Sequence, residues 1–190
     1  MGRTNKTKKR NVEVVLNVLA FDPSMTAFGW AVLNANNEVL DRGCIKTESE
    51  HKKLRIRKGD DTVRRINEVA EVLKQVMHEY DINFVVSELP HGSQSSTAAE
   101  MLGIVKGIVA TACVFRGISV EWYSEADAKK AVFGNKKTVS KTEMVNQISK
   151  LYAVDWFGVK YKDEAVADAL ALHVTAMKNS ATLKLFGNGR

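Results

Sequence analysis

Five short runs, rich in β-branched and aromatic residues, constrain the fold of this chain more than any other feature. Each has the length and composition of a β-strand, and turn-forming residues flank most of them. We therefore expect strands at residues 14–21, 28–33, 38–45, 82–87 and 118–123. The segment Asn34-Ala35-Asn36-Asn37 favours a turn, so the second and third strands are predicted to form a hairpin.

Apolar residues recur every three or four positions in the segments between and after the later strands, a pattern typical of helices. The clearest case is the segment 62–80, where Val63, Ile66 and Val69 begin a single apolar face. Thr97 with Glu100 and Ser140 with Glu143 have the spacing of capping boxes. Further helices are expected at about 97–115, from Ser124 to just before Gly134, at 141–152 and at 163–177.

The order of these elements predicts an α/β fold. A hairpin followed by β-α-β crossovers gives a mixed five-stranded sheet, with an N-terminal hairpin and parallel strands, flanked by helices. The 190 residues contain no internal repeat and no dividing linker. We expect one domain over 12–178, a basic flexible arm over 1–11 and an unstructured tail over 179–190.

Two acidic residues stand at the ends of expected strands. Asp22 ends the first strand and Glu88 ends the fourth. If these strands are parallel neighbours, both carboxylates emerge at the carboxyl edge of the sheet, where open α/β sheets place their sites. Two negative charges there repel each other unless a cation lies between them. Taken singly, Asp22 also fits an ordinary Asx-type turn, and Glu88 is simply a strand end.

The last expected helix supplies further carboxylates. Glu164 and Asp168 are four residues apart and share one face. Asp168 lies in an alanine- and leucine-rich surface, where an acid is costly without a positive partner, so an interior salt bridge is one explanation for it. Asp163 is interpreted as the N-cap of this helix. Carboxylates without histidine or thiolate ligands favour Mg²⁺ or Mn²⁺, and three or four of them could hold two ions for phosphodiester hydrolysis.

The charge of the chain favours an anionic partner. The formal net charge is +6 and the pI is about 9.3. Lysines that could neutralise DNA phosphates gather around Gly134, at Lys129, Lys130, Lys136, Lys137 and Lys141. A solvated helix face explains them equally well on charge alone. The basic segment from Lys46 to Lys58 has the same two explanations, a contact for a DNA arm or a solvated loop.

From about Val14 to Met177 the chain resembles the RuvC-type Holliday junction resolvases. The resemblance is carried by Phe21-Asp22-Pro23-Ser24 with Gly29, by Glu88 with Leu102-Gly103 and Gly107, and by the stretch from Tyr123 to Gly134 with Lys141 and Ala167 to Leu172. It implies an RNase H-like fold, a homodimer, divalent metal and paired symmetric nicks across a four-way junction. It assigns metal binding to Asp22, Glu88 and Asp168, and DNA-backbone contacts to Lys130 and Lys141.

The chain departs from the family pattern in two places. The family usually has an acid three residues before the position of Asp168, where this chain has Ala165. We expect Glu164 to take that role, with Asp163 in reserve. His91 stands where the family often has an aromatic residue near the junction centre, and it is expected to stack on a base, contact a phosphate or cap the bend.

Gly103 and Gly107 lie one turn apart within an expected helix, where each glycine costs about 1 kcal/mol relative to alanine. That cost predicts the close approach of another helix, either inside the fold or across a dimer.

The main hypothesis is a homodimeric endonuclease that acts on four-way or branched DNA with two Mg²⁺ or Mn²⁺ ions. The missing acid at Ala165 motivates a rival, a branched-DNA-binding protein with a degenerate, non-catalytic site. An actin-like or sugar-kinase-like nucleotide binder would need a second phosphate-binding loop and a duplicated domain, so no nucleotide cofactor is expected.

The remaining expectations concern the environment of the protein. The apolar stretch Met101–Phe115 is shorter than a membrane span and contains Lys106, so no membrane partner is expected. Cys44 and Cys113 lack the spacing of metal ligands. We interpret them as reduced thiols in a cytoplasmic protein.

Overall fold

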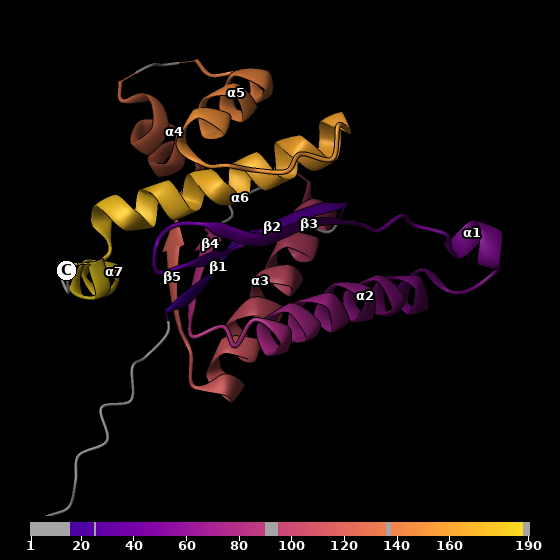
Figure 1. Cartoon of the computed structure of the whole chain (residues 1–190). Coiled ribbons are helices and arrows are strands. Elements are labelled where there is room, and N and C mark those ends of the chain that lie inside the picture. The colour runs from indigo at the N-terminus through magenta and orange to yellow at the C-terminus, as the bar shows by residue number, and fades with distance from the viewer. Residues whose placement is uncertain (1–15, 25, 90–94, 136–137, 188–190) are drawn as a thin grey trace, which may run out of the picture.

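The structure, a computed structural model, describes residues 16–24, 26–89, 95–135 and 138–187. These residues form a mixed five-stranded sheet between helices, in the strand order β3-β2-β1-β4-β5 (Figure 1). The first two pairings, β1 with β2 and β2 with β3, are antiparallel. The pairings of β4 with β1 and with β5 are parallel, which confirms the predicted hairpin and parallel strands. The strands are β1 (Asn17–Asp22), β2 (Ala27–Asn34), β3 (Val39–Lys46), β4 (Phe84–Glu88) and β5 (Ser119–Tyr123).

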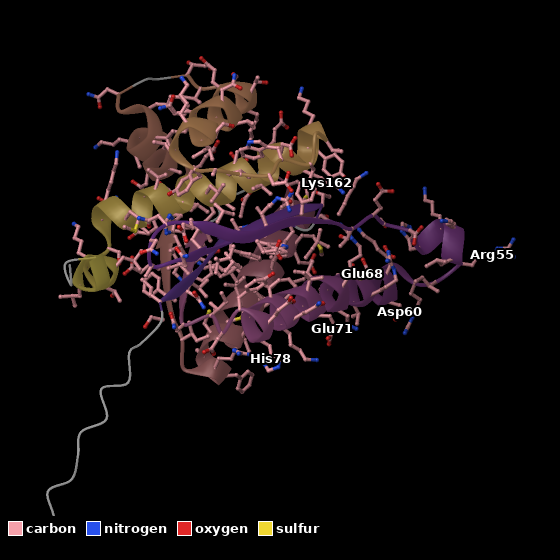
Figure 2. The ribbon with its side chains drawn as sticks, viewed as in Figure 1. Arg55, Asp60, Glu68, Glu71, His78 and Lys162 are labelled. Carbon is pink, nitrogen blue, oxygen red and sulfur yellow. The ribbon has the colours of Figure 1, made fainter. Side chains whose placement is uncertain are left out.

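Helices cover both faces of the sheet. On one face α6 (Lys160–Asn179) runs across the strands, with α4 (Glu125–Phe133) and α5 (Lys141–Leu151) packed against it (Figure 1). On the other face lie α2 (Lys58–Glu79) and α3 (Ser96–Arg116). The short helix α1 (His51–Leu54) stands beyond the end of β3, and Arg55 projects there, away from the layered body of the molecule (Figure 2).

The alternation of side chains along the strands divides the core into two clusters. Because successive residues of a strand point to opposite faces, Val18 and Ala20 pack toward α6, whereas Leu19 and Phe21 pack toward α2 and α3. All four are almost completely buried. The same alternation directs Asp22, two residues after Ala20, to the side of the sheet that α6 covers.

Several element boundaries differ from the sequence predictions. Ser95, not Thr97, caps α3, and its hydroxyl accepts a hydrogen bond from the amide of Ala98. The predicted capping boxes at Ser124 and Ser140 are confirmed. The prediction of an unstructured tail was wrong, because residues Ala181–Gly187 form α7, whose Leu183 is buried against the core. The expected basic arm over 1–11 lies outside the described residues.

The helix α3 is unusually apolar and unusually exposed. Within the described part of the chain it alone has the length and composition to cross a membrane, and 17% of its most apolar stretch is buried. The helix is 21 residues long. The sequence analysis excluded a membrane span because the apolar stretch Met101–Phe115 is short. The whole helix is long enough to cross a membrane, so its length alone does not exclude a span. Val114 and Phe115 at its end are 77% and 86% exposed.

The approach of α6 to the sheet depends on a glycine in β2. A methyl group placed on Gly29 would lie 2.2 Å from the carbonyl oxygen of Ala165 and 2.8 Å from its Cβ. Neither atom can move without shifting α6, because one belongs to the helix backbone and the other is fixed to it. Gly29 therefore sets how closely α6, and any functional group on it, approaches the sheet.

We predict that Gly29→Ala lowers the free energy of unfolding by about 3 kcal/mol, the upper end of the range for overpacking a core. Urea unfolding followed by circular dichroism measures the change. Gly59→Ala in α2 is the matched control, since nothing lies within 4 Å of its added methyl group. The control should be neutral or slightly stabilising. An equally stable Gly29→Ala protein would contradict this account of the packing.

Candidate active site

Parallel pairing of β1 with β4 brings Asp22 and Glu88 together at the carboxyl edge of the sheet. Phe21 is paired with Ser87, so the next residue of each strand leaves the sheet at the same level. Glu88 lies near enough for its charge to raise the pKa of Asp22. The predicted convergence of these two acids is therefore present in the structure.

Asp168 reaches the same place from α6. It lines, with Asp22 and Glu88, a cavity of about 270 Å³ whose further walls come from α3, α4 and α5. The three acids are separated widely in the sequence and come from two strands and a helix. The turn that follows Asp22 is organised by Ser24, whose hydroxyl accepts a hydrogen bond from the amide of Ala27 (3.3 Å).

The electrostatics of the cavity disfavour three negative charges. Burial raises the pKa of Asp22 well above its ordinary value, and the charges of Asp168 and Glu88 raise it further. Burial also raises the pKa of Glu88 and that of Asp168. The cavity therefore holds protons more tightly than ordinary carboxylates do, and it would bind another positive charge in their place.

Lys141, at the start of α5, supplies one positive charge. Its ammonium group donates a hydrogen bond to Oδ2 of Asp168. Burial alone would lower the pKa of Lys141, but the carboxylates of Asp168 and Asp22 outweigh that effect and raise it. Lys141 is thus the positive partner that the apolar surroundings of Asp168 led us to expect.

The donor set of the cavity fits a hard divalent cation. It consists of carboxylate oxygens whose charges Lys129 and Lys141 compensate only in part, and such oxygens are the ligands that Mg²⁺ prefers. Among the residues that the structure describes, no three histidine, cysteine or acidic side chains are arranged to hold a metal ion at once. In the present structure Asp168 is instead paired with the ammonium group of Lys141.

The other two acids of the last helix lie elsewhere. Glu164 is near enough to Asp168 to raise the pKa of that residue slightly, yet it does not line the cavity. The interpretation of Asp163 as the N-cap of the helix was wrong, because α6 begins three residues earlier and Val159 occupies that position. Oδ1 of Asp163 instead accepts a hydrogen bond from the amide of Phe157 (2.9 Å), which ties the preceding loop to the first turn.

The predicted DNA-contacting residues divide into three groups. Lys129 and Lys141 line the cavity. Lys130 is exposed on α4 but is not among the residues that line the cavity. Lys136, Lys137 and His91 lie outside the described residues. In the basic segment from Lys46 to Lys58, Lys46, Lys53 and Arg57 pair with nearby acids, as expected of a solvated loop.

The cavity is also lined by a fourth acid, which the sequence analysis did not identify. Glu125, the first residue of α4, stands beside the three acids, and its charge raises the pKa of Glu88. The strand order contained the signal for it. Because β5 runs parallel to β4, the chain leaving β5 emerges at the same edge as Glu88.

Comparison with known proteins identifies relatives along most of the chain. A family model described as crossover junction endodeoxyribonuclease RuvC matches residues 18–176. The protein of that name from Shewanella woodyi is 27% identical over 176 residues, which cover 90% of this chain and 91% of the relative. Its counterpart from Protochlamydia amoebophila is 27% identical over 160 residues, covering 83% and 88% respectively.

Solved structures share the fold. Thermus thermophilus RuvC in complex with a Holliday junction substrate superposes with a TM-score of 0.67 at 19% identity, covering 84% of this chain and 91% of that one. The yeast mitochondrial Holliday junction resolvase superposes with a TM-score of 0.61 at 12% identity, covering 90% and 81%. The fold is therefore RNase H-like, as the resemblance implied.

We predict that Asp22→Asn stabilises the protein at neutral pH in the presence of a chelator, by about 0.5–2 kcal/mol. The pKa of Asp22 is higher in the folded protein than its ordinary value of 3.8, so the folded state loses stability as pH rises between these two values. The gain from Asn should be full above that interval and absent below it. Urea unfolding across a pH series measures it, and a destabilised variant at neutral pH would contradict the electrostatic account.

Proposed function

The chain belongs to the family of crossover junction endodeoxyribonuclease RuvC, and from that premise we propose that it resolves four-way DNA junctions by paired symmetric nicks. The observation that carries the proposal is the convergence of Asp22, Glu88 and Asp168 in one cavity. Three half-buried acids whose pKa values are raised by burial weaken a fold, and the charges of Asp168 and Glu88 add to this effect at Asp22. A catalytic use therefore explains their presence better than a structural one.

We propose that Asp22, Glu88 and Asp168 hold two Mg²⁺ ions, with Mn²⁺ able to substitute. Any proton held by these carboxylates would be released when the ions bind, since metal ligands must be deprotonated. When bound, the ions activate water and stabilise the leaving oxygen of a phosphodiester. The cavity walls from α3, α4 and α5 limit access of solvent to the carboxylates.

The lysines of the cavity have a separate role toward DNA. Lys141 and Lys129 present ammonium groups at its mouth, with side chains 56% and 36% exposed. Release of Asp168 by Lys141 would free this lysine for a backbone phosphate of the substrate. Lys130, exposed on α4, extends the same basic surface outward. The protein would act on branched DNA in the cytoplasm.

A branched-DNA-binding protein without catalysis is the second candidate, and one observation favours it. Ala165 has no carboxylate where the family usually has an acid, and it is buried against Gly29. The proposed nuclease and this candidate differ in a single measurable outcome, strand cleavage.

We predict that the wild-type protein nicks a labelled four-way junction in Mg²⁺ and that Asp22→Asn reduces the rate at least about a thousandfold, as loss of an essential group does. Binding of the junction in a gel-shift assay should remain, because Asp22 contributes no positive charge. Flap, fork and linear duplex substrates of the same sequence are the controls. Junction binding by wild type without any nick in Mg²⁺ or Mn²⁺ would favour the non-catalytic candidate.

We infer further that two copies associate through α3. Gly103, Gly107 and Thr111 recur every four residues and are exposed on one side of the helix. The space beside both glycines is open, with no described atom within 4 Å of an added methyl group. Of the two alternatives expected for these glycines, a close helix inside the fold is not found among the described residues, and we propose the other, a partner copy.

The groove beside these glycines has the character of a contact between proteins. It measures about 450 Å³ and lies between α2 and α3, with Leu73 on one side and Ile108 and Phe115 on the other. A second copy is the occupant that fits a resolvase, because paired symmetric nicks across a junction need two active sites related by a twofold axis.

We predict that the wild-type chain sediments as a dimer and that Phe115→Glu shifts it to a monomer, since a charge in an apolar contact is costly. Leu185→Glu, which alters a side chain that is 78% exposed on α7, is the control and should remain dimeric. Analytical ultracentrifugation at micromolar concentration measures both. A monomeric wild type, or a dimer that Phe115→Glu leaves intact, would exclude this interface.

A further inference from the structure

Glu125 has a position that the catalytic scheme above leaves unused. It lines the cavity of Asp22, Glu88 and Asp168, but it comes from α4, which packs against α6. Its side chain is 49% exposed and lies 2.6 Å from the ammonium group of Lys129, one turn along the helix. Glu125 is therefore close to the three acids while still accessible from the cavity.

The sheet fixes this position independently of Glu125 itself. Tyr123, at the end of β5, is paired with Glu88, and its carbonyl oxygen accepts a hydrogen bond from the amide of Leu89 (2.7 Å). The capping box of Ser124 with Asp127 then starts α4 at the next residue. Glu125 thus begins its helix two residues after the partner of Glu88, with little freedom to lie elsewhere.

The first turn of a helix favours a negatively charged side chain such as that of Glu125. The unpaired amides and the macrodipole at this end of α4 stabilise negative charge, and Lys129 adds a positive neighbour. Glu125 raises the pKa of Glu88 and of Asp168 by its charge, so it acts on both at short range. A cation placed among these groups would relieve the repulsion at once.

The helix α6 does not provide the fourth acid at the family's usual place. Ala165 fills that position and is 6% exposed, pressed against Gly29. Glu164, the expected substitute, does not line the cavity. Of the acids on the described elements, those that do line it are Asp22, Glu88, Asp168 and Glu125.

We propose that Glu125 supplies the fourth carboxylate of the metal site in this chain, taking over from α4 the part that the family places at the position of Ala165. The inference rests on the proposed nuclease function, because it assigns Glu125 to the same pair of divalent ions. It also moves one ligand from α6 to α4, so the metal would tie together two helices that flank the cavity.

The test is calorimetric titration of the full-length protein with Mn²⁺, followed by junction cleavage at varied Mg²⁺. We expect Glu125→Gln to weaken Mn²⁺ binding at least about tenfold, or to remove one of two binding events, and to raise the Mg²⁺ concentration that half-saturates cleavage. Glu164→Gln is the matched control and should leave both measurements unchanged. Circular dichroism and the melting temperature in chelator show that each variant is folded.

The outcomes separate this inference from the function on which it rests. Wild type that binds no Mn²⁺ and cuts no junction would overturn the proposed function itself. Wild type that binds and cuts, with Glu125→Gln unaltered, would overturn the inference alone. A loss of Mn²⁺ affinity in Glu164→Gln but not in Glu125→Gln would return the fourth position to α6. If Glu125 served only its ion pair with Lys129, its variant would change the melting temperature and not the Mn²⁺ affinity.

Discussion

Repulsion among half-buried carboxylates is the interaction on which the rest of this structure depends. Asp22 loses hydration at the end of β1 and faces the charges of Asp168 and Glu88. The ammonium group of Lys141, which donates a hydrogen bond to Asp168, offsets part of that cost. A site built in this way binds cations readily, because every added positive charge removes repulsion that the fold itself has created.

The sheet and one glycine impose this repulsion. Parallel pairing of β1 with β4 places Asp22 beside Glu88. Because Gly29 has no side chain, α6 can approach the sheet closely and bring Asp168 to the same edge. A stability cost at the carboxyl edge is then balanced by the two large apolar clusters on either side of the sheet. Catalytic geometry and core packing are therefore coupled through α6.

The exposed face of α3 and Glu125 on α4 also carry a cost in stability that binding of a partner or an ion would offset. The glycines of α3 lower helix stability, and no described atom lies within 4 Å of a methyl group added at either, so the proposed association of two copies would explain them. Glu125 similarly adds negative charge to a cavity that already holds three acids, and a bound cation would convert this cost into affinity. Both features fit the proposed dimer and the proposed metal site.

The sequence by itself determined the order of strands and helices along the chain, the helix caps at Ser124 and Ser140, and the positions of Asp22 and Glu88 at strand ends, since periodicity and capping are local properties. Only the tertiary structure decided that Lys141 contacts Asp168, that Glu125 lines the cavity while Glu164 does not, and that Asp163 binds the loop at Phe157. These contacts depend on how α4, α5 and α6 rotate and slide as they pack. No local pattern encodes that rotation, because it is set by the shapes of side chains that are distant in the chain.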